Sequence, residues 1–152
     1  MKGAYALVIE IERPIKVRIK SLGVVSFGAG SWVYVGSAMG RTSTSLERRI
    51  ERHFRSQKSV YWHIDHLLAE KVHLAKAVWA ESVEHVECDI AQLMQGREEF
   101  EVGPLKFGAS DCRRGCKSHI FRISTKESED DIVKDVFKTL GLHGLITADG
   151  RL

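Results

Sequence analysis

Arg49 and His53 stand four residues apart on a predicted helix, and residues with this spacing face the same side of a helix. The apolar stripe of that helix has i, i+4, i+8 spacing and consists of Leu46, Ile50 and Phe54. Arg49 and His53 lie on or beside this stripe. A cation held near a buried stripe is costly unless an anion meets it, so the pattern indicates a phosphate-binding site.

The elements that would position these side chains are a short strand and the helix itself. The strand is predicted over residues 32–36, and a polar loop leads from it into a helix predicted over residues 44–57. A side-chain oxygen of Ser43, Thr44 or Ser45 can cap the first turn. The cations on the solvent side of the helix and beside it form a predicted nucleic-acid-binding surface: Arg41, Arg48, Arg52, Arg55 and Lys58.

Two tripeptides carry a resemblance to a known family. Tyr-Val-Gly at 34–36, followed by the helix with its Arg and His, resembles the second half of the GIY-YIG nuclease signature. Gly-Ala-Tyr at 3–5 resembles the first half, with Ala in place of the usual Ile. Three later stretches resemble one branch, the largely uncharacterised archaeal and bacterial Uri-type proteins: residues 61–65, 107–112 and 118–121. The resemblance covers about residues 2–124.

The resemblance implies a metal-dependent endonuclease that hydrolyses phosphodiester bonds. Both tyrosines of the signature line the active site in that family, so Tyr5 and Tyr34 would activate or position the attacking water. Tyr5 could act as a base only beside positive charge, because the pKa of a free tyrosine is about 10, and Arg49 and His53 would supply that charge. Arg49, helped by His53, would stabilise the scissile phosphate. The alternatives are core tyrosines with paired hydroxyls, a surface Arg49 and a core His53.

The metal ligand that the family uses would be a glutamate on a later helix, and Glu87 is the candidate. That helix is predicted from an N-cap at Ser82 to about residue 95. Its apolar stripe consists of Val83, Val86, Ile90, Leu93 and Met94. Glu87 falls within the edge of the stripe, where a carboxylate must be paired or must bind a cation. One Mg²⁺ or Mn²⁺ ion suits such an oxygen ligand, and a structural ion pair with Arg49 is the alternative.

The sequence departs from the family because it contains no Asn, whereas most family members carry one near the active site. Ser110, Asp111 or His119 could stand in for it, since each offers a donor or an acceptor. His63 and Asp65 could support the site from behind or contact DNA. Either of these two could instead cap the helix in which they lie.

A group of cysteines and histidines in the second half of the chain offers a different chemistry. Cys112, Cys116 and His119 supply thiolate and imidazole ligands of the kind that bind zinc. A fourth ligand could be Cys88, or a histidine of the His-Ile-Asp-His stretch at 63–66. The spacing is not that of a standard zinc knuckle, so we favour buried inert cysteines over zinc, with a redox disulfide as the third alternative.

Composition and charge narrow the class of protein. The chain has 152 residues, of which 43% are apolar and 28% charged, as in an ordinary globular domain. No apolar run approaches the roughly 20 residues of a membrane span, and three cysteines without an export signal favour a reducing, cytoplasmic compartment. Residues 1–60 carry 11 Lys and Arg against 4 Asp and Glu, whereas residues 61–152 are net acidic. The basic half suits a polyanion, DNA before RNA, with a repair protein as a further partner.

The order of predicted elements indicates one α/β (α+β) domain over residues 1–152, with a core of about residues 2–124 and a C-terminal helix and tail over 125–152. The resemblance implies a small, mostly antiparallel central sheet flanked by helices. Its strands would be residues 4–12, 32–36 and 72–80, with extra strands at the edges. The other predicted elements are a half-exposed strand at 16–20, a glycine-punctuated connection at 23–30, a helix at 61–71, a loop or short strand at 98–107, a loop at 110–117, a strand at 119–124, a helix at 129–140 and a weakly structured tail over the last eleven residues.

Two rivals to the endonuclease use the same residues differently. A non-catalytic nucleic-acid-binding module on the same fold would keep the basic face and would explain the missing Asn. A zinc-stabilised interaction protein would use the cysteines and histidines instead. Cleavage assays and the metal content of the purified protein separate the three hypotheses.

Overall fold

A six-stranded sheet forms the centre of the molecule in the computed structural model, which describes residues 1–56 and 58–152. Its strands, in spatial order, are β6 (Phe100–Val102), β7 (Ile120–Ile123), β4 (Gly30–Ala38), β1 (Gly3–Ile11), β5 (His73–Glu81) and β8 (Leu145–Thr147). Every neighbouring pair in this sheet is antiparallel. The predicted α+β class is confirmed, with β4, β1 and β5 in the middle and further strands at both edges.

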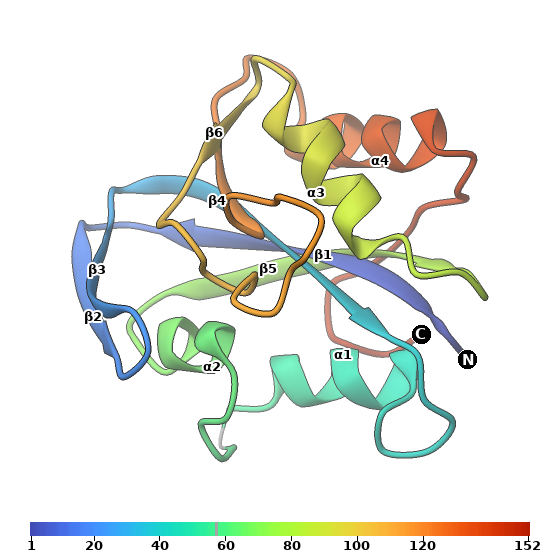
Figure 1. The fold of residues 1–152 in the computed structure, drawn as a ribbon, viewed down its shortest axis with the longest axis horizontal. Helices are drawn as coiled ribbons and strands as arrows, with labels where there is room; N and C mark the ends of the chain where they lie inside the picture. The colour runs from blue at the N-terminus through green and yellow to red at the C-terminus, as the bar shows by residue number, and fades with distance from the viewer. Residues whose placement is uncertain (57) are drawn as a thin grey trace.

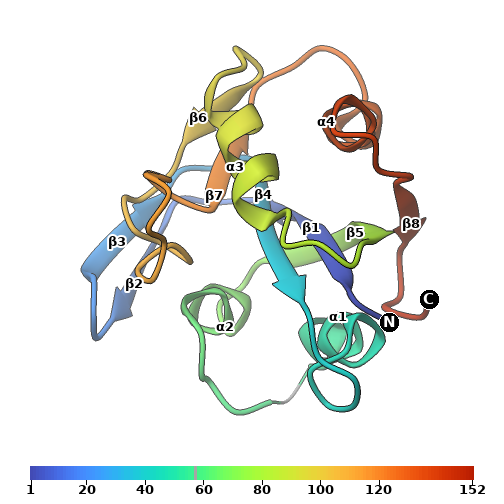
Figure 2. The same ribbon diagram turned by 45° about the vertical axis from the view of Figure 1, so that its right-hand side comes forward.

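Helices cover both faces of this sheet. On one face lie α1 (Leu46–Phe54) and α2 (His63–Leu68), and on the other lie α3 (Glu87–Gln95) and α4 (Glu129–Thr139) (Figure 1). Figure 2 shows the same separation after a turn of the molecule. The alternating side chains of β1 divide accordingly, because Ala4 and Ala6 belong to the core under α3 and α4, whereas Tyr5, Leu7 and Ile9 face α1 and α2.

A two-stranded hairpin stands beside the main sheet. It consists of β2 (Ile15–Ile19) and β3 (Gly23–Phe27), which pair antiparallel and appear at the left of Figure 1. β2 confirms the half-exposed strand that strict alternation predicts, since buried Val17 and Ile19 alternate with exposed Lys16, Arg18 and Lys20. The prediction of a mere connection at residues 23–30 is wrong. Phe27, which is 1% exposed, anchors β3 in the core. Pairing with β2 stabilises β3 although glycines flank it.

Two further boundary predictions are wrong for local reasons. The tail is partly ordered, because β8 pairs with the edge of β5 through residues 77–79. The helix predicted from Ser82 begins only at Glu87. The hydroxyl of Ser82 accepts the backbone N–H of Glu84 and donates to its carbonyl, which closes a turn before the helix can start. Val83, predicted to lie in the apolar stripe, is therefore exposed.

The ends of the remaining helices follow capping rules. Ser45 is the N-cap of α1, where its hydroxyl accepts the backbone N–H of Arg48 at 3.3 Å. The predicted end of this helix at Gln57 lies outside the described residues, and α1 ends at Phe54. α2 is shorter than predicted, and α4 stops before Gly141, whose φ of +76° suits glycine. Among the described residues, no helix combines the length and apolarity needed to cross a bilayer.

Candidate active site

A small cavity of about 230 Å³ opens where β1, β4, α1 and α3 meet. We call it the tyrosine cavity. Its walls come from six segments of the chain and consist of Tyr5, Tyr34, Gly36, Ser37, Arg49, Trp62, Glu87 and Gly108. The four residues to which the sequence assigns water activation, phosphate binding and metal binding, namely Tyr5, Tyr34, Arg49 and Glu87, thus line one space.

The register between β1 and β4 brings the two tyrosines together. Tyr5 stands opposite Gly36, and Leu7 stands opposite Tyr34, so both tyrosines point to the face that carries α1 and α2. Gly36 makes room for the ring of Tyr5. A Cβ at this position would lie 2.5 Å from both Cζ and Oη of Tyr5, closer than atoms can approach.

Tyr5 forms a hydrogen bond with His53, and His53 carries no positive charge that could favour the ionised form of Tyr5. Its hydroxyl lies 2.7 Å from Nε2 of His53, and both side chains are 2% exposed. Burial lowers the pKa of His53 to about 3, so the imidazole is neutral at pH 7. Burial, with Tyr34 nearby, raises the pKa of Tyr5 well above 10, and Arg49 opposes this only in part. The prediction that His53 supplies positive charge to Tyr5 is therefore wrong, because the neutral ring offers an acceptor or a donor instead.

Tyr34 forms the floor of the cavity beside the loop that enters β7. It is 8% exposed, its ring meets Phe107 edge-on at 6.1 Å, and burial raises its pKa far above the usual range. Gly108 packs on this ring with a φ of +68°, and a Cβ there would lie 2.8 Å from Cε1 of Tyr34. Tyr34 is thus a neutral hydroxyl held in place at the wall of the cavity.

Arg49 is oriented by two contacts. Its Nη1 donates to the carbonyl of Ser37 at 2.7 Å, and its Cζ lies 4.6 Å from the centre of the Trp62 ring. These contacts use one of the five guanidinium N–H groups and one face of the group. The side chain therefore keeps donors for an anion in the cavity, which agrees with the predicted phosphate site.

Arg52, predicted as a solvent-facing DNA contact, is half-buried and paired with a carboxylate, although it still lies on the outer side of α1. It covers the Trp62 ring with its Cζ at 4.7 Å from the centre, and binds Asp65 through both nitrogens at 2.8 and 3.0 Å. Asp65 also accepts the backbone N–H groups of Tyr61 and Trp62 and so caps α2. Burial alone would raise the pKa of Asp65, but these hydrogen bonds outweigh it and hold the pKa below the usual value.

Glu87 reaches the cavity from the first turn of α3. β7 pairs with β4 only from Ser31 to Tyr34, so the end of β4 remains accessible to α3. The Glu87 side chain is 29% exposed, and burial raises its pKa to about 7 against the opposing effects of Arg49 and Ser37. Its Oε2 lies 3.7 Å from Nδ1 of His119, whose pKa burial lowers, so this contact is not an ion pair at pH 7. A half-buried carboxylate that faces a polar cavity fits a hard divalent cation, which would restore its charged form.

The cysteines converge beside Glu87. One ligand atom from each of Cys88, Cys112, Cys116 and His119 lies within 4.8 Å of all the others, so the group could hold a metal ion. We call these four residues the cysteine cluster. Of the alternatives for a fourth ligand, the structure brings Cys88 to the group. His63 lies elsewhere, because its Nδ1 accepts the backbone N–H of Gly108 and its Nε2 bonds with the hydroxyl of Ser21.

The candidates for the role of the missing Asn separate clearly. Ser110 and Asp111 are exposed and are not part of the cavity lining. His119 is buried and lies next to Glu87. His63 supports the cavity from behind, through its bond with Gly108. Of the three candidates, His119 is therefore the one placed to replace the missing Asn.

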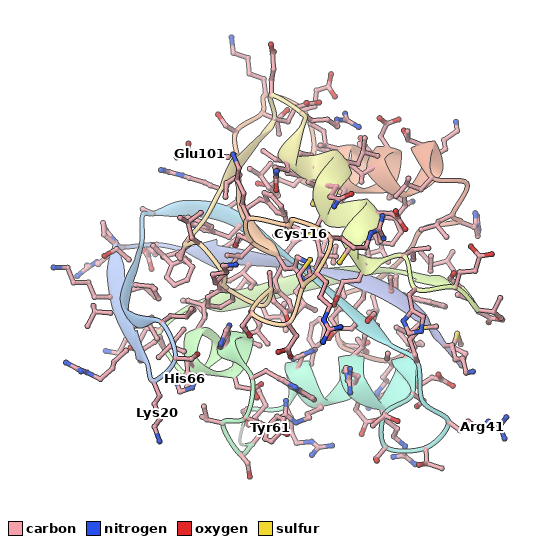
Figure 3. The ribbon with its side chains drawn as sticks, viewed as in Figure 1. Lys20, Arg41, Tyr61, His66, Glu101 and Cys116 are labelled. Atoms are coloured by element: carbon pink, nitrogen blue, oxygen red, sulfur yellow. The ribbon has the colours of Figure 1, made fainter. Side chains whose placement is uncertain are left out.

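A basic cleft of about 680 Å³ runs along the outer side of α1 and is lined by Arg41, Thr42, Ser43, Ser45, Glu47, Arg48, Arg52 and Arg55. Arg48 and Arg55 are exposed there, as predicted. Figure 3 shows Arg41 projecting outward near one end of α1 and Tyr61 near the other. Lys58 contributes differently, because its Nζ donates to the carbonyls of His53 and Arg55 and so completes the C-terminal end of the helix.

Sequence reasoning missed three residues of the tyrosine cavity. The ring of Trp62 contacts the guanidinium groups of both Arg49 and Arg52. The only signal for it in the sequence was the pair of adjacent aromatic residues, Tyr61 and Trp62, whose rings meet edge-on at 5.2 Å. Gly108 lies in a stretch that resembles the Uri-type branch, although its positive φ could not be foreseen from one sequence. Ser37 holds Arg49 through its backbone carbonyl, a contact that residue type does not reveal.

Comparison with protein families matches residues 4–142 to a family described as "Domain of unknown function DUF123". Comparison with curated proteins and with solved structures returned no match. The match spans the strands and helices that build the tyrosine cavity and the residues of the cysteine cluster. Function must therefore be argued from the geometry of these two groups.

Proposed function

The chain belongs to the DUF123 family, and on the geometry of its tyrosine cavity we propose that it is a metal-dependent endonuclease of the GIY-YIG type. The observation that carries the proposal is the convergence of Tyr5, Tyr34, Arg49 and Glu87 on one cavity. These four side chains come from four different elements, and each can supply a role that phosphodiester hydrolysis uses.

Arg49 would bind the scissile phosphate. Its guanidinium is held by Ser37 and Trp62, so little conformational freedom is lost when an anion binds. Donors fixed in this way stabilise the charge that develops on the phosphoryl oxygens in the transition state. The neutral hydroxyl of Tyr34, which lines the same cavity, can donate to a phosphoryl oxygen or orient the attacking water.

Tyr5 and His53 would move the proton of that water. As the water oxygen bonds to phosphorus, its proton passes to the hydroxyl oxygen of Tyr5, whose own proton passes to Nε2 of His53 over the 2.7 Å bond. The leaving oxygen departs with the electrons of the broken P–O bond and takes a proton from solvent. The negative charge of a bound phosphate favours the imidazolium that forms, which burial alone disfavours.

Glu87 is the residue that would hold the divalent ion. A bound Mg²⁺ or Mn²⁺ would supply charge neutralisation at the phosphate and a lower pKa for coordinated water. The carboxylate faces the same cavity as Arg49, so a phosphate between them would meet a positive group on each side once the ion is bound.

DNA is the substrate that we propose, with RNA as the alternative. The basic cleft lies on the outer side of α1, the helix whose inner side carries Arg49 and His53. A polyanion that follows the cleft would therefore pass close to the tyrosine cavity. A role in DNA repair or processing would suit cutting that depends on strand structure more than on base sequence.

The test is cleavage of end-labelled single-stranded, duplex, flapped and branched DNA, and of matched RNA, with Mg²⁺, with Mn²⁺ or without added divalent metal. Glu87→Gln keeps the size of the side chain and removes its charge. Glu84→Gln changes an exposed carboxylate three residues earlier and is the matched control. We expect metal-dependent cutting by the unchanged protein and by Glu84→Gln, and a loss of about 100-fold or more in Glu87→Gln.

The second candidate is a non-catalytic nucleic-acid-binding module. It is favoured by the basic cleft, which can bind a phosphate backbone without the tyrosine cavity, and by the absence of any Asn. Tight binding to all these nucleic acids with no cutting under either metal would replace the endonuclease by this candidate.

A further inference from the structure

The loop of residues 103–119, between β6 and β7, brings a second set of reactive side chains next to the tyrosine cavity. It carries Cys112, Cys116 and His119 to Cys88, which lies in the first turn of α3. Figure 3 shows Cys116 where this loop meets α3. We propose that the cysteine cluster binds one zinc ion, that this ion fixes the loop against α3, and that Glu87 orients the histidine ligand.

The distances within the cluster are those of a tetrahedral site. A Zn–S bond of about 2.3 Å in tetrahedral geometry places two sulfurs about 3.8 Å apart. Sγ of Cys88 lies 3.5 Å from Sγ of Cys112 and 3.9 Å from Nε2 of His119. All four ligand atoms lie within 4.8 Å of one another. Small side-chain adjustments would close such a group around one ion.

The ligand types select zinc over the harder divalent ions. Three thiolates and one imidazole form a donor set that suits zinc and other thiophilic metals, whereas Mg²⁺ and Mn²⁺ prefer oxygen. The backbone N–H of Arg114 points at Sγ of Cys112 at 3.4 Å, and a donor in this position stabilises a charged sulfur. Cys116 and His119 are 5% and 2% exposed, so water has little access to the group.

His119 supplies the second, independent observation. Its Nδ1 is buried and has no hydrogen-bond partner among the described residues, while Nε2 faces Cys88. A histidine that binds a metal through one nitrogen commonly donates its other N–H to a carboxylate. Oε2 of Glu87 lies 3.7 Å from Nδ1, in position to accept that bond after a small movement. Zinc binding thus gives each polar atom of a buried imidazole a partner.

Packing alone does not explain why three thiols and an imidazole meet at one point, although Cys116 is part of the core and Cys88 and Cys112 pack against it. The loop is tied to α3 by other contacts, in which Arg114 pairs with Asp89 at 2.7 Å and its carbonyl accepts Nε2 of Gln92 at 2.6 Å. These contacts are exposed and do not involve the cysteine side chains, so they link the loop to α3 independently of a metal. A disulfide requires sulfurs about 2.0 Å apart, and the cysteines are free.

The first measurement is the metal content of the full chain, expressed without a polyhistidine tag and dialysed against metal-free buffer. We expect about one zinc per chain, and a mercurial that modifies the three thiols should release it. Replacement by Co²⁺ should give the intense visible and near-ultraviolet bands of thiolate-bound tetrahedral cobalt. Protein that folds and holds no zinc, or that has lost two mass units through a disulfide, would overturn the proposal.

Variants assign the ligands. Cys112→Ser and Cys116→Ser should each lose the zinc, whereas His143→Ala, at an exposed histidine outside the cluster, should retain it. If the serine variants do not fold, the stoichiometry of zinc release from the unchanged protein decides instead. Zinc retained by both serine variants would contradict the assignment.

Glu87 separates this proposal from the endonuclease. Glu87→Gln keeps an oxygen that can accept the N–H of His119, so zinc content should stay at about one while cleavage is lost. Glu87→Ala removes the acceptor and should weaken zinc binding by about 10–100-fold in a chelator competition. Absence of cleavage in the unchanged protein with full zinc content would refute the endonuclease alone, and unchanged zinc affinity in Glu87→Ala would refute the orienting role.

Discussion

The hydroxyl of Tyr5 and Nε2 of His53 lie 2.7 Å apart although 48 positions separate the two residues in the chain. One side chain comes from the middle of the sheet and the other from the inner side of α1. Their rings are tilted by 51° with centres 5.3 Å apart, so the contact is a hydrogen bond rather than a stack. A proton-transfer pair requires this hydrogen bond, and a buried core tyrosine with a paired hydroxyl would make it equally.

Removal of the Tyr5 hydroxyl should abolish most of the cleavage and little of the stability. In Tyr5→Phe the ring still packs over Gly36, but the proton of the attacking water has no acceptor, so we expect the single-turnover rate to fall by about 10²–10⁴-fold. Tyr61→Phe, at a residue 77% exposed, is the control and should cut normally. A Tyr5→Phe protein with the full rate would exclude Tyr5 from the chemistry.

Gly36→Ala should disturb the same site by a steric clash, without removing any functional group. The added Cβ would meet Cζ and Oη of Tyr5 at 2.5 Å, so the ring must move, with an overpacking cost of about 1–3 kcal/mol in the free energy of unfolding. We expect the cleavage rate to drop together with the melting temperature. Gly96→Ala is the matched control, because its nearest atom would be 3.7 Å away and its φ of −89° suits alanine. Equal stability of the two variants would argue against close contact at Gly36.

The Arg52–Asp65 pair predicts a pH dependence of stability. The pKa of folded Asp65 lies below its ordinary value, so its contribution is present above the unfolded pKa of about 3.9 and is lost as pH falls through the folded pKa. At pH 7 we expect Asp65→Asn to be less stable by about 3 kcal/mol, because a buried charge network is broken.

The measurement is denaturant unfolding of both proteins from pH 7 to pH 2.5. The stability difference should be constant down to about pH 5 and should shrink below it. Glu51→Gln disturbs only the exposed pair with Arg55, at 3.8 Å, and should shift stability by less than about 0.5 kcal/mol. A difference between wild type and Asp65→Asn that does not change with pH would mean that Asp65 has the same pKa in the folded and the unfolded protein.

The basic cleft should govern binding and not bond cleavage. Arg48 is exposed in this cleft, so Arg48→Ala should weaken DNA binding and lower the slope of log affinity against log salt by about 0.7–0.9. Lys138→Ala removes a charge from α4, on the other side of the sheet, and should leave the slope unchanged. Single-turnover cleavage at saturating protein should be near normal in both. An equal effect of the two variants would indicate that binding depends on overall charge.

Much of the fold followed from short-range patterns. The alternation of Lys16 to Lys20, the stripe of Leu46 and Ile50, and the glycine after α4 predicted elements that the structure confirms. β3 and β8 were missed because each depends on a neighbouring strand. Their apolar residues did not distinguish a strand from a loop, because Val24 in β3 and Leu145 in β8 are exposed although they are apolar.

The sequence predicted which residues line the tyrosine cavity better than it predicted their charge states. Arg49 and Glu87 were selected because a charge beside an apolar stripe needs a partner, and both line the tyrosine cavity. Glu87 was selected from a predicted helix that began too early, at Ser82. Its position in the first turn of α3 still directs it to the cavity. The neutral state of His53 and the pairing of Arg52 with a carboxylate depend on burial by distant segments, which residue spacing does not reveal.

The pairing of Tyr5 with Gly36 across β1 and β4 also limits how this chain can change in length. Successive residues of a strand point to opposite faces, so inserting or deleting one residue before Tyr5 within β1 would turn Ala4 or Ala6 toward the cavity and the tyrosine toward α3. The same length change in the turn between β2 and β3 would leave this register intact. The turn between β2 and β3 can therefore change in length without shifting this register if the bond between Ser21 and His63 is kept, whereas the two central strands cannot.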